Sequence, residues 1–63
     1  MKRIYTRVRN ETFEKKIAFY TARKQYEAVD ALRSLARDAG VPLDEARVQE
    51  LTEEYRTALE GMQ

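Results

Sequence analysis

The sequence predicts a small, mainly α-helical single domain that forms a homodimer, and three observations lead to this prediction. The chain has 63 residues with no Cys and no His. A domain of this length buries a small core, and without disulfides or metals it commonly gains stability from another chain. Residues 26–39 and about 43–61 carry apolar side chains at helical spacing. We therefore expect one domain over residues 1–63, with residues 1–10 as a strand or flexible arm and 11–63 as an antiparallel helical hairpin.

Residues 2–9 alternate between two kinds of side chain. Ile4, Thr6 and Val8 share one face of an extended chain, and Arg3, Tyr5, Arg7 and Arg9 share the other. Such alternation, with β-branched residues on one face, predicts a short N-terminal strand. A lone strand leaves backbone groups unpaired, so we expect the same strand of a second chain to pair with it.

Residues 13–24 fit two structures. Phe13, Ile17 and Tyr20 line up on one side of a helix, whereas Phe13, Ile17, Phe19 and Thr21 share one face of a strand. No Gly or Pro occurs between residues 11 and 39, which favours one continuous helix over 11–39 with Asn10 or Thr12 as the N-cap. A β-hairpin over residues 3–22 is the alternative.

Residues 26–39 show the period of an amphipathic helix. The apolar positions recur three and four apart: Ala28, Ala31, Leu32, Leu35 and Ala39. Gly40 follows at the position where a helix end adopts a left-handed conformation, and Pro42 suits the first turn of a next helix.

The last segment, 43–61, repeats apolar residues like a coiled-coil seam: Val48, Leu51, Tyr55, Ala58 and Met62, with Leu59 beside them. Because the loop before it is short, we expect the two helices to fold back antiparallel. The residues expected at a dimer or partner interface are Leu32, Leu35, Val48, Leu51, Tyr55 and Leu59.

Charge is divided along the chain. Residues 1–24 hold eight cationic and two acidic side chains, and residues 25–63 hold four and nine. A basic segment of this kind indicates a polyanionic partner. Two other interpretations are mutual attraction between opposite ends within a dimer and two faces that are simply solvated. The residues expected to contact nucleic acid are Arg3, Tyr5, Arg7, Arg9, Lys15 and Lys16.

The alternating segment from Lys2 to about Phe13 resembles the ribbon-helix-helix family of dimeric DNA-binding proteins. The resemblance implies a two-stranded ribbon in the DNA major groove, with Arg3, Tyr5 and Arg7 facing the bases and residues 10–12 starting the first helix. In a second register, the sequence LRSLARDAGVPLDEARVQEL resembles the family's helix, Gly turn and helix. The strand would then be residues 19–24, with Thr21 and Arg23 outward and residues 1–15 as an extra arm.

The composition also limits chemistry. Without His or Cys there is no Ser-His or Cys-His nucleophile pair and none of the usual zinc, haem or iron–sulfur ligand sets. We therefore expect no enzymatic activity, metal or cofactor. The sequence shows no apolar membrane span and no signal-peptide core after Met1, which predicts a cytoplasmic protein. The leading hypothesis is a small DNA-binding regulator; the alternative is a protein-binding module (an inhibitor, antitoxin or adaptor) acting through the acidic C-terminal hairpin.

Overall fold

The computed structural model describes the backbone of residues 2–61 and the side chains of residues 8–61. It contains three α-helices: α1 (Lys2–Ala22), α2 (Tyr26–Asp38) and α3 (Glu45–Gly61). Residues 2–61 include no strand. The prediction of a mainly helical chain is confirmed.

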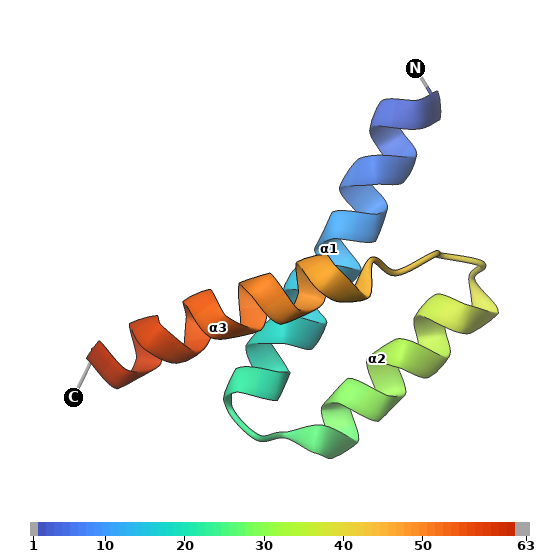
Figure 1. Cartoon of the computed structure of the whole chain (residues 1–63). Coiled ribbons are helices and arrows are strands. Elements are labelled where there is room, and N and C mark those ends of the chain that lie inside the picture. Colours follow the sequence, from blue (N-terminus) through green and yellow to red (C-terminus); the bar gives the residue numbers. More distant parts are fainter. Residues whose placement is uncertain (1, 62–63) are drawn as a thin grey trace.

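Helix α1 is the common partner of the other two helices. Figure 1 shows that α3 crosses α1 and that α2 runs back alongside α1. The first turns of α1 project beyond both α2 and α3. Both α2 and α3 pack against α1, whereas no Cα of α2 lies within 8 Å of a Cα of α3. Within the expected hairpin of 11–39 against 43–61, the part of the first segment that packs against α3 is therefore α1 and not α2.

The expected continuous helix over 11–39 is interrupted at residues 23–25. Lys24 has a φ of 63°, the left-handed conformation that ends many helices. The N–H of Gln25 donates to the carbonyl of Tyr20 at 2.9 Å, and that of Lys24 donates to Thr21 at 3.0 Å. This is the Schellman pattern, formed here without glycine, which is why the absence of Gly and Pro did not reveal the break.

The end of α2 uses the same pattern at the residue that the sequence marks. Gly40 has a φ of 71°, its N–H donates to Arg37 at 3.1 Å, and the N–H of Val41 donates to Ala36 at 2.8 Å. Val41 is buried directly after this turn. The prediction of Gly40 as the residue that ends this helix is confirmed.

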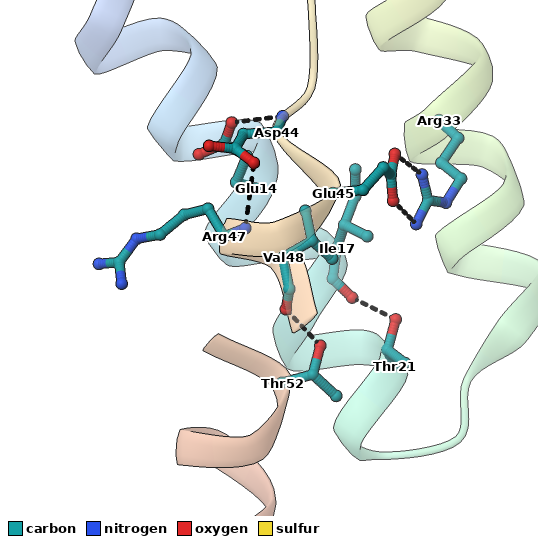
Figure 2. Close-up of polar contacts among 9 residues, drawn as sticks. All are labelled: Glu14, Ile17, Thr21, Arg33, Asp44, Glu45, Arg47, Val48 and Thr52. Atoms are coloured by element: carbon teal, nitrogen blue, oxygen red, sulfur yellow. Dashed lines mark hydrogen bonds and ion pairs between the residues drawn. The ribbon is translucent and has the colours of Figure 1, made fainter. Parts of the chain in front are cut away.

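Side chains from three elements fix the start of α3, as Figure 2 shows. A carboxylate oxygen of Glu14 in α1 accepts a hydrogen bond from the N–H of Asp44 at 3.0 Å. The Asp44 carboxylate accepts from the N–H of Arg47 at 3.2 Å, which makes Asp44 the N-cap of α3. Arg33 of α2 donates two hydrogen bonds to Glu45, at 2.7 and 3.0 Å.

The core lies where α2 and α3 meet the middle of α1. Ile17, Val29 and Val48, one from each helix, form the central cluster, and Tyr20, Leu32 and Leu43 pack around it. Ile17 and Ala18 are fully buried. Thr21 and Thr52, on the inner sides of α1 and α3, donate their hydroxyls to backbone carbonyls one turn earlier, so these polar groups have partners.

The expected strand over residues 2–9 needs a second chain beside it and stays a prediction, while in the single chain this segment is helical. In the single chain, the backbone of residues 2–9 is the first part of α1, and the β-hairpin over 3–22 and the alternative strand over 19–24 are also replaced by helix or by its terminal turn. A helix satisfies most backbone groups within its own segment, whereas a strand needs a second strand beside it. A ribbon shared by two chains is a property of a dimer and stays a prediction.

Candidate nucleic-acid interface

Three exposed cations lie along one side of α1. Arg9, Lys16 and Arg23 are seven residues apart, a spacing that turns about 20° less than two full helical turns. Arg23 follows the last helical residue, and its N–H still donates to the carbonyl of Phe19 at 3.2 Å, which continues the turn. With a rise of about 1.5 Å per residue, the three cations span about 21 Å. We call them the basic line.

The members of the basic line form no ion pair with any described residue, in contrast to most other cations of residues 8–61. Lys15 pairs with Glu11, Arg33 with Glu45, and Arg56 with Glu53. Arg47 lies 3.4 Å from Glu50 and 4.0 Å from Glu54. The acids of α3 are thus partly neutralised within α3, and the charge of the basic line is available to an external anion.

A shallow hollow of about 470 Å³ adjoins the basic line. Its lining consists of Lys15, Lys16, Phe19, Tyr20, Leu32 and Tyr55, and we call it the aromatic hollow. Phe19 is 38% exposed although it is a large apolar residue. Its ring meets the ring of Tyr20 edge-on at 5.5 Å and that of Tyr55 at 6.2 Å. The guanidinium of Arg23 lies 5.4 Å from the centre of the Phe19 ring.

Helix α2 carries a second uncovered apolar surface. Leu35 is 57% exposed, and Ala31 and Ala39 beside it are exposed as well. The buried side of α2 is formed by Val29 and Ala36. The apolar stripe predicted from periodicity therefore lies at the edge of the core, and much of it faces away from the rest of the chain.

The predicted nucleic-acid residues divide into two groups. Arg9, Lys15 and Lys16 are exposed on α1, two of them beside the aromatic hollow. Arg3, Tyr5 and Arg7 lie in the part of α1 for which the structure describes the backbone only. Sequence reasoning did not include Phe19 and Arg23 in this set. The seven-residue spacing of Arg9, Lys16 and Arg23 was the available signal, and it becomes meaningful once residues 9–22 are helical and Arg23 continues the turn.

The predicted interface residues also divide. Val48 and Leu51 are buried in the chain's own core, and Leu32 packs against that core. Tyr55 and Leu59 are half-buried, and Tyr55 lines the aromatic hollow. Of the six, Leu35 alone is exposed for more than half of its surface among these described residues.

The pair of Arg33 and Glu45 shows the clearest electrostatic perturbation. The hydrogen bonds from Arg33 lower the pKa of Glu45, and the same bonds raise the pKa of Arg33. Both side chains keep contact with solvent, so the pair joins α2 to α3 at the surface. Within residues 8–61, no three acidic side chains converge in a way that would hold a metal ion. None of the described helices has the length and apolar character needed to cross a bilayer.

The chain matches no protein-family model, and comparisons with curated proteins and with solved structures found no match. The resemblance to ribbon-helix-helix proteins accordingly stays a prediction from the sequence.

Proposed function

We propose that this chain is a small, dimeric DNA-binding regulatory protein of the cytoplasm that contacts backbone phosphates through α1. The observation that carries the proposal is the basic line: Arg9, Lys16 and Arg23 lie in a row on an exposed helix side without acidic partners among the described residues. A linear array of about 21 Å suits a polyanion better than a single small anion. The basic residues before Arg9 extend the cationic sequence toward the N-terminus.

The energetic basis of such binding is release of condensed counterions. Each phosphate neutralised by a cationic side chain contributes about −0.9 to the slope of log affinity against log salt on duplex DNA. Cations already paired within the protein gain less from a phosphate, because they first lose a carboxylate partner. This difference separates the basic line from Arg47 and Arg56, which have such partners.

Salt-dependent binding to a short labelled duplex tests the proposal. We expect the triple variant Arg9→Gln, Lys16→Gln, Arg23→Gln to flatten the salt slope by about 2 to 3. The control is Arg33→Gln, Arg47→Gln, Arg56→Gln, which removes the same net charge from the ion-paired arginines of α2 and α3 and should leave the slope within about one unit of the parent. Equal slopes for the two variants, or no duplex binding at about 50 mM salt, would contradict the proposal.

The exposed side of α2 supports the dimeric state. Leu35 with Ala31 and Ala39 forms an apolar surface that no described part of the chain covers. Burying such a surface against a second copy is favourable by about 25 cal/mol of free energy for each Å² removed from water. We expect Leu35→Lys to halve the mass measured by analytical ultracentrifugation, with Ser34→Lys, an exposed neighbour, as the control. A single-subunit mass for the parent protein at micromolar concentration would rule out the dimer.

The second candidate is a protein-binding module that acts through the acidic outer side of α3. Glu50, Glu53, Glu54 and Glu60 are exposed there and favour a basic partner. Three of these four acids lie within ion-pair distance of Arg47 or Arg56. The partly neutralised charge makes this surface a weaker attractor than the basic line, and we rank this function second.

A further inference from the structure

The aromatic hollow combines exposed ring surface with cationic side chains, and this combination identifies a class of nucleic acid. We propose that an unpaired segment of a nucleic-acid strand binds across the hollow, with a base stacked on the Phe19 and Arg23 pair. The inference rests on the proposed function, since it assigns the ligand of the same side of α1. The inference goes beyond the proposed function because it requires an unpaired strand at this position.

Phe19 is held in a fixed orientation while part of its surface stays open. The edge-on contacts with Tyr20, at 71° between ring planes, and with Tyr55, at 76°, restrain the ring from two sides. A residue restrained in this way loses little conformational entropy when a ligand binds. Its 38% exposure is unfavourable in water and is relieved when an aromatic ligand covers the ring.

Arg23 adds a planar cation to the same platform. Its guanidinium lies 5.4 Å from the centre of the Phe19 ring, so the two groups form a cation–π pair at the exposed end of α1. Bases stack on guanidinium planes as well as on aromatic rings. Arg23 therefore serves two purposes in this proposal, as the last cation of the basic line and as a stacking surface.

The remaining cations of the hollow lie where a strand's phosphates would run. Lys15 and Lys16 line the hollow one turn before Phe19, and Arg23 lies one turn after it. Positive charge on both sides of an aromatic residue is the arrangement that single-strand-binding surfaces use. In a duplex the flat faces of the bases are covered by their neighbours, so Phe19 gains contact only with an unpaired base. An acidic protein segment would need no ring face, which makes it the less suitable ligand here.

Fluorescence anisotropy with a labelled oligothymidylate of twelve nucleotides, and with the duplex of the same strand, tests the inference. We expect Phe19→Leu, which keeps apolar bulk but removes the ring, to weaken binding of the single strand by about 5- to 150-fold. Binding of the duplex should change by less than about twofold. The matched control is Tyr26→Leu, because Tyr26 is an aromatic residue of α2 that is 60% exposed and does not line the hollow.

Arg23→Lys separates stacking from charge. Lysine keeps the positive charge but lacks the guanidinium plane, so we expect weaker binding of the single strand with an unchanged salt slope. Circular dichroism and a thermal melt of each variant establish that the helices persist. Arg23→Lys should melt close to the parent, and Phe19→Leu, which loses two edge-on ring contacts, should melt lower with the same helix content.

The outcomes distinguish this inference from the proposed function. Equal single-strand affinities for Phe19→Leu and Tyr26→Leu would overturn the stacking site, while a salt slope that still depends on the basic line would leave the proposed function intact. If Phe19→Leu lost binding to the single strand and to the duplex equally, that result would also overturn the stacking site. If neither the strand nor the duplex binds the parent protein at about 50 mM salt, both proposals fall together.

Discussion

Glu14 of α1 accepts a hydrogen bond from the backbone N–H of Asp44, thirty residues later in the chain. Glu14 is 7% exposed, so this carboxylate is buried at the place where α3 begins. A negative group near a helix N-terminus is also favoured by the helix dipole. The Glu14 side chain thereby fixes the start of α3 against α1.

Removing this acceptor should destabilise the fold. We expect Glu14→Ala to lower the free energy of unfolding by about 1–3 kcal/mol, because the Asp44 N–H loses its partner in a buried setting. Glu14→Gln keeps an oxygen acceptor and should cost less. Urea unfolding at pH 7 measures both, and a Glu14→Ala variant as stable as the parent would show that water replaces the carboxylate.

The break between α1 and α2 leads to a stabilising substitution. Lys24 holds a φ of 63°, which costs a residue with a side chain about 1–2 kcal/mol relative to glycine. We expect Lys24→Gly to raise the free energy of unfolding by about 1 kcal/mol, after the greater freedom of glycine in the unfolded chain is subtracted. Lys15→Gly, inside α1, is the control and should lower stability by a similar amount. A destabilising Lys24→Gly would contradict the left-handed assignment.

In the turn after α2, replacing the glycine should destabilise the fold. Gly40→Ala puts a side chain at a φ of 71°, and we expect a loss of about 1–2 kcal/mol in unfolding free energy. The open space around Gly40 means that backbone strain, and not a clash, is the cause. Gly61→Ala at the end of α3 has no such constraint and should change stability by less than about 1 kcal/mol. Thermal melts followed at 222 nm compare the two.

The ion pair of Arg33 and Glu45 gives a pH dependence with a defined sign. Arg33 lowers the pKa of Glu45 in the folded chain, so the pair stabilises the fold above the ordinary glutamate pKa of about 4.3, and this stabilisation is lost as the pH falls through the lowered pKa. Both side chains are well exposed, so we expect less than about 1 kcal/mol. Glu45→Gln should be less stable than the parent at pH 7 and equally stable near pH 2. A difference that persists near pH 2 would assign the effect to packing.

The core prediction concerns Ile17, the residue at the meeting point of all three helices. We expect Ile17→Ala to lower the free energy of unfolding by about 2–5 kcal/mol and Ile17→Val by about 0.5–1.5, because Ile17 is fully buried. Val8→Ala, at a residue 58% exposed on the same helix, should have little effect. Denaturant midpoints for the three variants measure the order of their stabilities.

Helix positions were predictable from the sequence where local signals were strong. Residues 26–39 were expected and Tyr26–Asp38 is observed, because apolar spacing and Gly40 mark this helix. The start of α3 was also near its expected place, since Asp44 supplies an N-cap. The interruption at Lys24 was not predictable, because a lysine there carries no local signal for a left-handed backbone.

The packing of α2 was harder to infer because the apolar side of this helix is wider than the part that the core covers. Periodicity put Leu35 on the apolar stripe of α2 and made it a candidate for a dimer or partner interface, which stays a prediction. In the single chain, Val29 and Ala36 face the core and Leu35 is exposed. Which part of a wide apolar surface becomes buried depends on where α1 lies, and that is a tertiary property. The candidate site was predictable to a similar extent. Lys15 and Lys16 were expected there, whereas the role of Phe19 depends on its contact with Tyr55 of α3, which is also a tertiary property.

Helix α1 packs closely against both other helices, whereas α2 and α3 touch each other through side chains alone, and this has a consequence for how the molecule opens. We expect either α2 or α3 to detach first, with loss of the Arg33–Glu45 pair, while the other stays docked on α1. Their backbone amides should then exchange with deuterium through partial openings that need less than the global free energy. The amides near Ile17 and Ala18 lose protection only when both neighbours have left. The slowest-exchanging protons of this protein should therefore belong to the middle of its first helix.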